Sequence, residues 1–124
     1  MTDTTKETVT LAIDIKKYRI RVHKKMLHLL GDPKYVQLLV NPNNKYVAVK
    51  GIEKPTLGDQ SEKIKSQNML PDNSYELYSK SFVEKLCDVA EITETNCTYR
   101  LTGTIVESHN MAIFSLKTLK RLEN

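Results

Sequence analysis

The sequence contains no tryptophan, only 4 glycines, 4 prolines and 2 cysteines among its 124 residues, and no long apolar run. So little glycine and proline excludes a collagen-like or low-complexity chain. A membrane-spanning helix needs roughly 18 consecutive apolar residues, and because no window approaches that length, we expect no membrane partner. With 40% apolar and 27% charged residues, the composition predicts one globular domain over residues 1–124.

The cysteines and the N-terminal residues bear on the cellular compartment. A signal peptide has a basic patch followed by an apolar run, whereas the first ten residues are polar and include Asp3 and Glu7. We therefore expect a cytoplasmic protein. Two isolated cysteines in that compartment are usually reduced, so we interpret Cys87 and Cys97 as free thiols.

The residue types that form catalytic and metal sites do not occur in recognisable patterns. No H-E-x-x-H or C-x-x-C spacing is present, which argues against a zinc site. Cys87 has no histidine base near it in the sequence, and the few glycines form no phosphate-binding loop. We expect no catalytic residues, no metal, no cofactor and no small-molecule substrate, and hence a protein that is not an enzyme.

The charge is distributed unevenly, although the net charge is only +4. Residues 16–50 contain nine lysines or arginines and a single acidic residue, Asp32, whereas residues 66–97 contain two basic and six acidic residues. A cluster of one sign indicates a binding surface more directly than the net charge does.

The first half of the chain predicts two strands, a short helix and a hairpin. Apolar residues alternate at period two in both strands, and the spacing then becomes helical until Gly31, which is typical of a helix end. The predicted ranges are residues 8–15 and 18–23 for the strands, 24–30 for the helix, and 35–40 with 45–49 for the hairpin, whose turn is Asn41-Pro42-Asn43-Asn44.

The second half predicts a strand, a helix and another hairpin. Their ranges are 75–78, 79–90, and 97–106 with 111–116. Ser81 and Glu84 have the spacing of a capping box at the start of the helix. We interpret residues 53–73 as a connecting segment with a short edge strand at 63–67, residues 117–124 as a frayed or helical tail, and residues 1–7 as a disordered tail.

The two halves resemble each other at an offset of 56 residues. This offset places Lys24 on Lys80 and Met26 on Phe82, and it preserves the apolar register of the helices. We therefore predict an α+β fold in which a β-α-β-β(-β) unit is used twice, at residues 8–52 and 74–116, and the two units pack as one pseudo-symmetric domain. Coincidence between two generic patterns remains the alternative.

The strongest functional signal is a run of basic residues on the first strand and helix. We call it the basic stripe. It consists of Lys17, Arg19, Arg21, Lys24, Lys25 and His28. Side chains that alternate outward on a strand and continue along a helix can converge on one surface. Such a surface binds nucleic acid by neutralising phosphates, independently of sequence and with strong salt dependence.

Other interpretations of the basic stripe stay open. The charges could instead protect an edge strand from aggregation. The protein could also be a protein-protein interaction module or a homo-oligomer, because the opposite charges of its two halves could pair between molecules. Whether the nucleic acid is DNA or RNA stays open as well.

Two resemblances to known families point in the same direction. The stretch RIRVHKKMLHLLGDPKYVQLLVNPNNKYVAVKG, residues 19–51, resembles the strand, short helix and hairpin of swapped-hairpin transition-state regulators, which are dimeric DNA-binding proteins. The repeated order of elements over the whole chain is similar to one domain of a DNA sliding clamp. That resemblance implies that Lys24, Lys25 and His28 face DNA from the first helix, and the acidic second helix departs from it.

Overall fold

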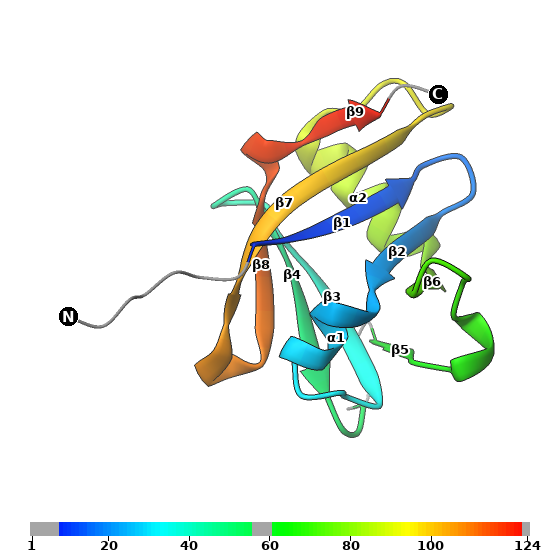
Figure 1. The fold of residues 1–124 in the computed structure, drawn as a ribbon. Helices are drawn as coiled ribbons and strands as arrows, with labels where there is room; N and C mark the ends of the chain where they lie inside the picture. Colours follow the sequence, from blue (N-terminus) through cyan, green and yellow to red (C-terminus); the bar gives the residue numbers. More distant parts are fainter. Residues whose placement is uncertain (1–7, 56–60, 123–124) are drawn as a thin grey trace.

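The computed structural model describes residues 8–55 and 61–122, and these residues form one antiparallel sheet with two α-helices (Figure 1). The strands are β1 (Thr8–Asp14), β2 (Arg19–His23), β3 (Tyr35–Asn41), β4 (Tyr46–Ile52), β5 (Ser61–Lys63), β6 (Ser74–Tyr78), β7 (Thr98–Val106), β8 (Met111–Ser115) and β9 (Lys120–Leu122), and the helices are α1 (Lys24–Leu29) and α2 (Lys80–Ala90). This mixed, strand-rich architecture is consistent with the predicted α+β class. The predicted disordered tail at 1–7 lies outside the described residues.

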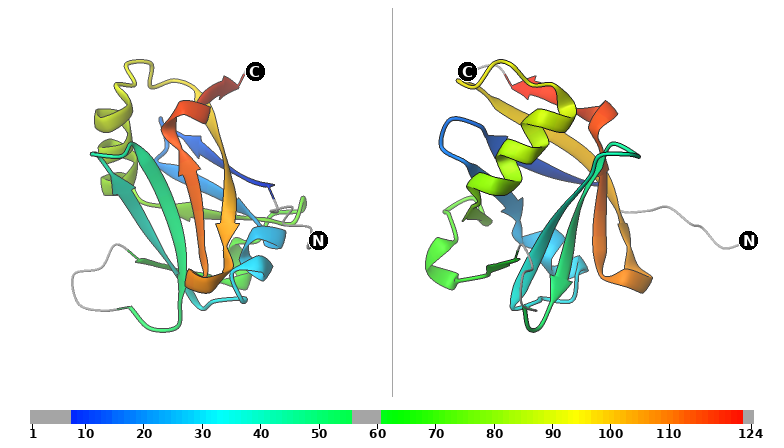
Figure 2. Two further views of the ribbon diagram at one scale, coloured as in Figure 1. Left: turned by 90° about the vertical axis from the view of Figure 1, so that its left-hand side faces the viewer. Right: turned by 180° about the vertical axis from the view of Figure 1, so that it is seen from behind.

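The sheet is nearly closed. Its strand order is β5-β3-β4-β8-β7-β1-β2-β6, and β9 pairs with β7. The sheet bends so that β3, β4 and β8 lie across the core from β1, β2 and β6 (Figures 1 and 2). Both parts contribute fully buried side chains, such as Leu11 and Ile20 on one side and Val36 and Phe114 on the other. The two ends of the strand order, β5 and β6, are left as sheet edges.

The first helix and the first hairpin form where the sequence predicts them. Gly31 and Asp32 follow α1 with φ values of 89° and 50°, and this left-handed backbone ends the helix. In the turn between β3 and β4, Oδ1 of Asn41 accepts hydrogen bonds at 3.0 Å from the backbone N–H groups of Asn43 and Asn44. Asparagine forms such turns readily because its short side chain reaches the following backbone.

The second helix begins at a different cap from the predicted one. The hydroxyl oxygen of Ser79 accepts a hydrogen bond from the backbone N–H of Phe82 at 3.3 Å, so Ser79 is the N-cap and the predicted capping box of Ser81 with Glu84 is wrong. The apolar stripe of α2 is buried and packs against β3. Figure 2 shows α2 crossing one side of the bent sheet.

Two short segments differ from the prediction. The edge strand expected at 63–67 is β5 at Ser61–Lys63, and a 3-10 helix, η1 (Ser66–Asn68), follows it. The backbone N–H of Ile64 donates to the Lys34 carbonyl at 2.8 Å, and there the pairing with β3 ends. The tail expected to be frayed or helical contains a 3-10 helix, η3 (Leu116–Thr118), and then β9, which pairs with the beginning of β7.

Candidate nucleic-acid interface

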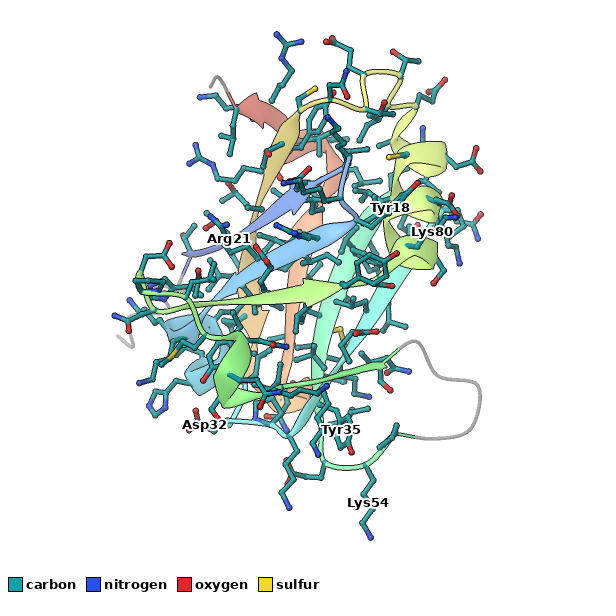
Figure 3. All side chains as sticks on the ribbon, turned by 90° about the vertical axis from the view of Figure 1, so that its right-hand side faces the viewer. Tyr18, Arg21, Asp32, Tyr35, Lys54 and Lys80 are labelled. Carbon is teal, nitrogen blue, oxygen red and sulfur yellow. The ribbon has the colours of Figure 1, made fainter. Side chains whose placement is uncertain are left out.

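Strand β2 directs two arginines of the basic stripe to the outside of the sheet. Ile20 and Val22 are completely buried, whereas Arg19 and Arg21 are exposed. This confirms that the strand has one core face and one basic face. Because β2 lies between β1 and β6, the two arginines stand on the outer surface of the sheet and not at its edge. Figure 3 shows Arg21 on this side of the molecule.

Both guanidinium groups contact one carboxylate, that of Glu76 on β6. The Arg21 Nη2 atom lies 3.4 Å from Glu76 Oε2, and Arg19 Nη1 lies 3.6 Å from Oε1. Arg21 is directly opposite Glu76 in the ladder. The Ser79 N–H donates to the carbonyl of Tyr18, the residue opposite it, so these two form a hydrogen-bonded pair. Hydrogen-bonded and non-hydrogen-bonded pairs alternate along an antiparallel ladder. Arg21 and Glu76 are therefore a non-hydrogen-bonded pair, the kind in which opposing side chains approach most closely.

These contacts neutralise the arginines only in part. The side chains of Arg19 and Arg21 are 44% and 50% exposed, and that of Glu76 is 27% exposed. Ion pairs this exposed contribute about 0 to 1 kcal/mol to stability. Two cations share one anion, so a positive charge remains. Sequence reasoning did not identify Glu76, because only the strand register brings it next to residues so far away in the chain.

A second carboxylate lies near the basic stripe. The hydroxyl group of Ser74 donates to Oδ1 of Asp72 at 2.6 Å. This hydrogen bond holds the pKa of Asp72 below its ordinary value, and the positive charge of Arg21 contributes in the same direction. Asp72 is therefore ionised at neutral pH, and its negative charge offsets part of the positive charge of Arg21.

The lysines of the basic stripe occupy the first turn of α1. Lys24 and Lys25 are exposed, and the turn contains no acidic residue. The N-cap is His23, whose Nδ1 accepts a hydrogen bond from the Lys25 backbone N–H at 3.0 Å. A helix carries positive partial charge at its N-terminus, which disfavours cations there. The helix dipole therefore does not account for Lys24 at this position.

The remaining members of the basic stripe lie at its two ends. His28 Nδ1 is 3.0 Å from Asp32 Oδ2, and both side chains are exposed. Lys17 is exposed in the turn that precedes β2, where its backbone N–H donates to Asp14 Oδ1 at 3.3 Å. The structure thus arranges the six residues along β2 and the helix that continues it, with Lys17 and His28 far apart.

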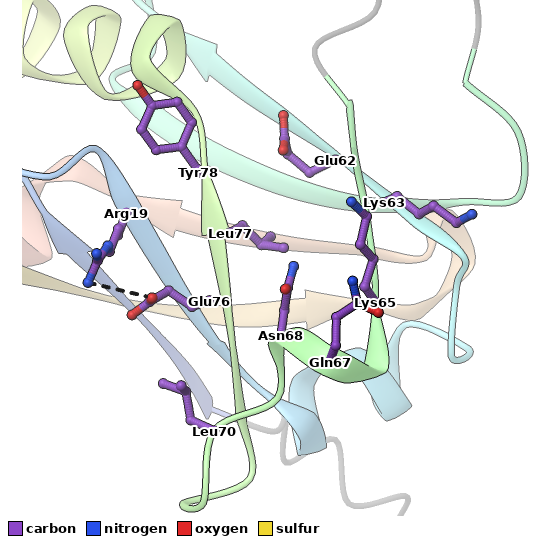
Figure 4. Close-up of a pocket in the computed structure, with 10 residues that line it drawn as sticks. All are labelled: Arg19, Glu62, Lys63, Lys65, Gln67, Asn68, Leu70, Glu76, Leu77 and Tyr78. Carbon is purple, nitrogen blue, oxygen red and sulfur yellow. Dashed lines mark ion pairs between the residues drawn. The ribbon is translucent and has the colours of Figure 1, made fainter.

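A groove adjoins the basic stripe between the two sheet edges (Figure 4). Its volume is about 470 Å³, and Arg19, Lys63 and Lys65 contribute positive charge to its lining. Gln67 and Asn68 of η1 line it as well. Sequence reasoning treated these residues as part of a connecting segment, although the alternating lysines at 63 and 65 were a signal that could have been noted.

Tyr78 stands beside this groove and is the most exposed of the large apolar side chains described, at 57%. It lies opposite Arg19 in the β2–β6 ladder. Its ring contacts the ring of Tyr18 edge to face, with 6.2 Å between the centroids. The Lys80 Nζ atom lies 5.7 Å from the centre of the Tyr18 ring. Sequence reasoning did not consider Tyr78.

Glu62 gives the groove an acidic side. It pairs with Val36 in the β5–β3 ladder, and because Val36 is completely buried, the Glu62 side chain points to the inner face of the sheet. Burial raises the pKa of Glu62 above its ordinary value, and the positive charge of Lys65 partly opposes this shift.

Comparisons of the chain with protein-family models, with curated proteins and with solved structures give no match. Its function has to be argued from the geometry.

Other kinds of site find little support in this geometry. The described parts of the chain contain no group of three or more His, Cys, Asp or Glu side chains that could hold a metal ion. Cys87 and Cys97 are both free thiols, as predicted. Burial, aided by the negative charge of Glu84, raises the pKa of Cys87, which makes this thiol a poor nucleophile. Within residues 8–55 and 61–122 no helix has the length and apolar character to cross a membrane.

Proposed function

We propose that the protein binds nucleic acid without catalysing a reaction, and that the basic stripe is the contact surface. The observation that carries this proposal is the first turn of α1. Lys24 stands there, exposed, in a helix turn that itself contains no acidic residue, against the electrostatic preference of the helix. A surface that exists only for solubility would not need a cation at this position.

Binding would proceed by neutralisation of phosphates. Lys17, Lys24 and Lys25 would contact phosphates, and the two arginines of β2 would exchange Glu76 for a phosphate group. Such contacts release counterions from the nucleic acid, so affinity depends steeply on salt and little on sequence.

Charge reversal tests this proposal. We expect the double variant Arg19→Glu, Lys24→Glu to lose about tenfold or more in affinity for a labelled oligonucleotide at low salt, measured by fluorescence anisotropy. Its unfolding free energy should change by less than about 1 kcal/mol, because both side chains are exposed. The control variant Lys85→Glu, Lys117→Glu has the same change in net charge at exposed positions outside the stripe. Equal affinities of the two double variants would contradict the proposal.

A second candidate function is protein-protein interaction through a sheet edge. Along Glu76–Tyr78, no strand of the described chain pairs with the outer side of β6. Because Ser79 N–H donates to the Tyr18 carbonyl, Glu76 and Tyr78 occupy the non-hydrogen-bonded positions of the β2–β6 ladder. Their backbone N–H and C=O groups therefore point away from β2, to this open side. A free edge can pair with a strand of another molecule. Sedimentation velocity over a concentration and salt series tests self-association, and a monomer throughout would exclude it.

The proposed internal duplication has support from the strand pairing. The strands that precede the helices of the two units, β2 and β6, pair with each other, and so do the last strands, β4 and β8.

On this basis we retain the resemblances to a sliding-clamp domain and to swapped-hairpin regulators as proposals. Superposition of residues 19–52 on residues 74–115 tests the duplication. Poor superposition of the two hairpins after alignment of β2 on β6 would argue against duplication.

A further inference from the structure

We propose that the groove between β5 and β6 is a subsite for single-stranded nucleic acid in which a base stacks on Tyr78. The neighbouring phosphates would contact the basic residues on the two sides of the groove. This inference rests on the proposed function, because Arg19 belongs both to the basic stripe and to the groove. It adds the class of ligand and a site that the basic stripe does not include.

Tyr78 has the exposure and support that a stacking platform needs. Among the described aromatic residues it alone is exposed, since the other tyrosines and both phenylalanines are buried or half-buried. The ring of Tyr18 stands at 86° to the Tyr78 ring and contacts it, which limits the motion of the platform. Any base can stack on such a ring because every base has a π face.

Cations lie on both sides of this platform. Arg19 is the cross-strand neighbour of Tyr78 on β2, and Lys63 and Lys65 line the opposite side of the groove, as Figure 4 shows. In single-stranded nucleic acid the phosphates lie on either side of each base. Basic residues that flank an exposed aromatic ring therefore match the charge pattern of a single strand.

Glu76 also lines the groove and pairs with Arg19 there, and three further polar groups suit the edge of a base. The side-chain amides of Gln67 and Asn68 can each donate and accept hydrogen bonds, and both line the groove. The carboxylate of Glu62 would repel a phosphate but can accept a hydrogen bond from a base amino group. A phosphate would thus be attracted by the two lysines, and a base amino group by the neighbouring Glu62.

Stacking on Tyr78 would distinguish single-stranded from duplex nucleic acid. In a duplex the faces of the bases are stacked on one another and are not available to a side chain. The basic stripe contacts phosphates and can bind either form. Removal of the Tyr78 ring should therefore weaken the binding of single strands and leave duplex binding unchanged.

Fluorescence anisotropy with a labelled single-stranded oligothymidine and a labelled duplex of mixed sequence tests this inference. We expect Tyr78→Ala to weaken single-strand binding by between about 5-fold and 150-fold, the range for loss of one stacked base. Tyr78→Phe keeps the aromatic face and should retain the wild-type affinity within about threefold. Lys63→Glu with Lys65→Glu should weaken single-strand binding as well.

The outcomes distinguish this inference from the proposed function. If Tyr78→Ala binds single strands as the wild type does, while Arg19→Glu, Lys24→Glu still abolishes binding, the subsite is wrong and the proposed function stands. If the wild type binds neither nucleic acid at low salt, both fail. Slowed amide hydrogen exchange at Glu76 and Tyr78 at high protein concentration, without nucleic-acid binding, would assign the groove to strand pairing between copies of the chain.

Discussion

At the scale of single residues, Glu76 decides how much positive charge the basic stripe presents. Its carboxylate contacts the guanidinium groups of both Arg19 and Arg21, so under the proposed function a phosphate would have to compete with it for two partners. The same contacts are exposed and add little to stability. In that function Glu76 would limit the affinity of the surface more than it holds the fold together.

Substitution of Glu76 by glutamine should therefore tighten nucleic-acid binding. Loss of the competing charge frees both arginines, and an exposed pair of this kind amounts to about 0.2 to 1 kcal/mol, or up to about fivefold in affinity. Anisotropy titrations of Glu76→Gln at low salt measure this gain. The control Glu107→Gln removes an exposed acidic residue of the turn between β7 and β8 and should have a smaller effect. Weaker binding of Glu76→Gln would contradict this role.

Glu62 should make the protein less stable as the pH rises. Because its pKa is raised in the folded protein, the folded state holds the proton more tightly than the unfolded state. The unfolding free energy then falls as the pH increases from the ordinary pKa of 4.5 through the raised value. Denaturant unfolding at pH 7 should show Glu62→Gln to be more stable than the wild type. The difference should shrink below pH 4, and a difference that does not vary with pH would count against the assignment.

Residues could be assigned to a face of a strand from the sequence, but their partners could not. Period-two alternation correctly placed Ile20 in the core and Arg19 outside. Nothing in the sequence indicates that Glu76 lies opposite Arg21, since this depends on the register between strands far apart in the chain. The same register places Tyr78 beside Arg19, which is why the aromatic residue of the proposed subsite was missed.

At the scale of elements, long periodic segments were predicted and short ones were not. Strands such as β7 contain enough residues for the alternation to be visible in the sequence. β5 and β9 have only three residues each, too few for any period. β9 is held by its pairing with Thr98, Tyr99 and Arg100 of β7, and such long-range contacts leave no local sequence signal.

The start of α2 provides a test at this scale. Ser79→Ala removes the hydroxyl oxygen that accepts from the Phe82 N–H, and loss of such a cap costs about 1 kcal/mol. Ser79→Thr keeps a hydroxyl cap without placing a charge at this buried position and should lose less. Denaturant unfolding of both variants checks this expectation. If Ser79→Ala were as stable as the wild type, the start of α2 would not depend on this cap.

At the scale of the whole molecule, the groove exists because the sheet bends until its two edge strands approach each other. Both β5 and β6 contribute to the lining, although no β-ladder joins these two strands in the described chain. The sequence predicted the longer strands of the sheet but not the path of the sheet, because the path depends on which hairpins pair. The basic stripe could be found from local patterns, whereas the groove beside it could not.

The salt dependence of single-strand binding by the wild-type protein tests the central claim most directly. If about five cations neutralise phosphates, the logarithm of the binding constant should fall with the logarithm of salt concentration at a slope of about −3.5. Anisotropy titrations at four salt concentrations from low to near-physiological would measure it. A slope near this value would establish the surface as a phosphate-binding site. No binding at the lowest salt, or binding that does not change with salt, would contradict the account.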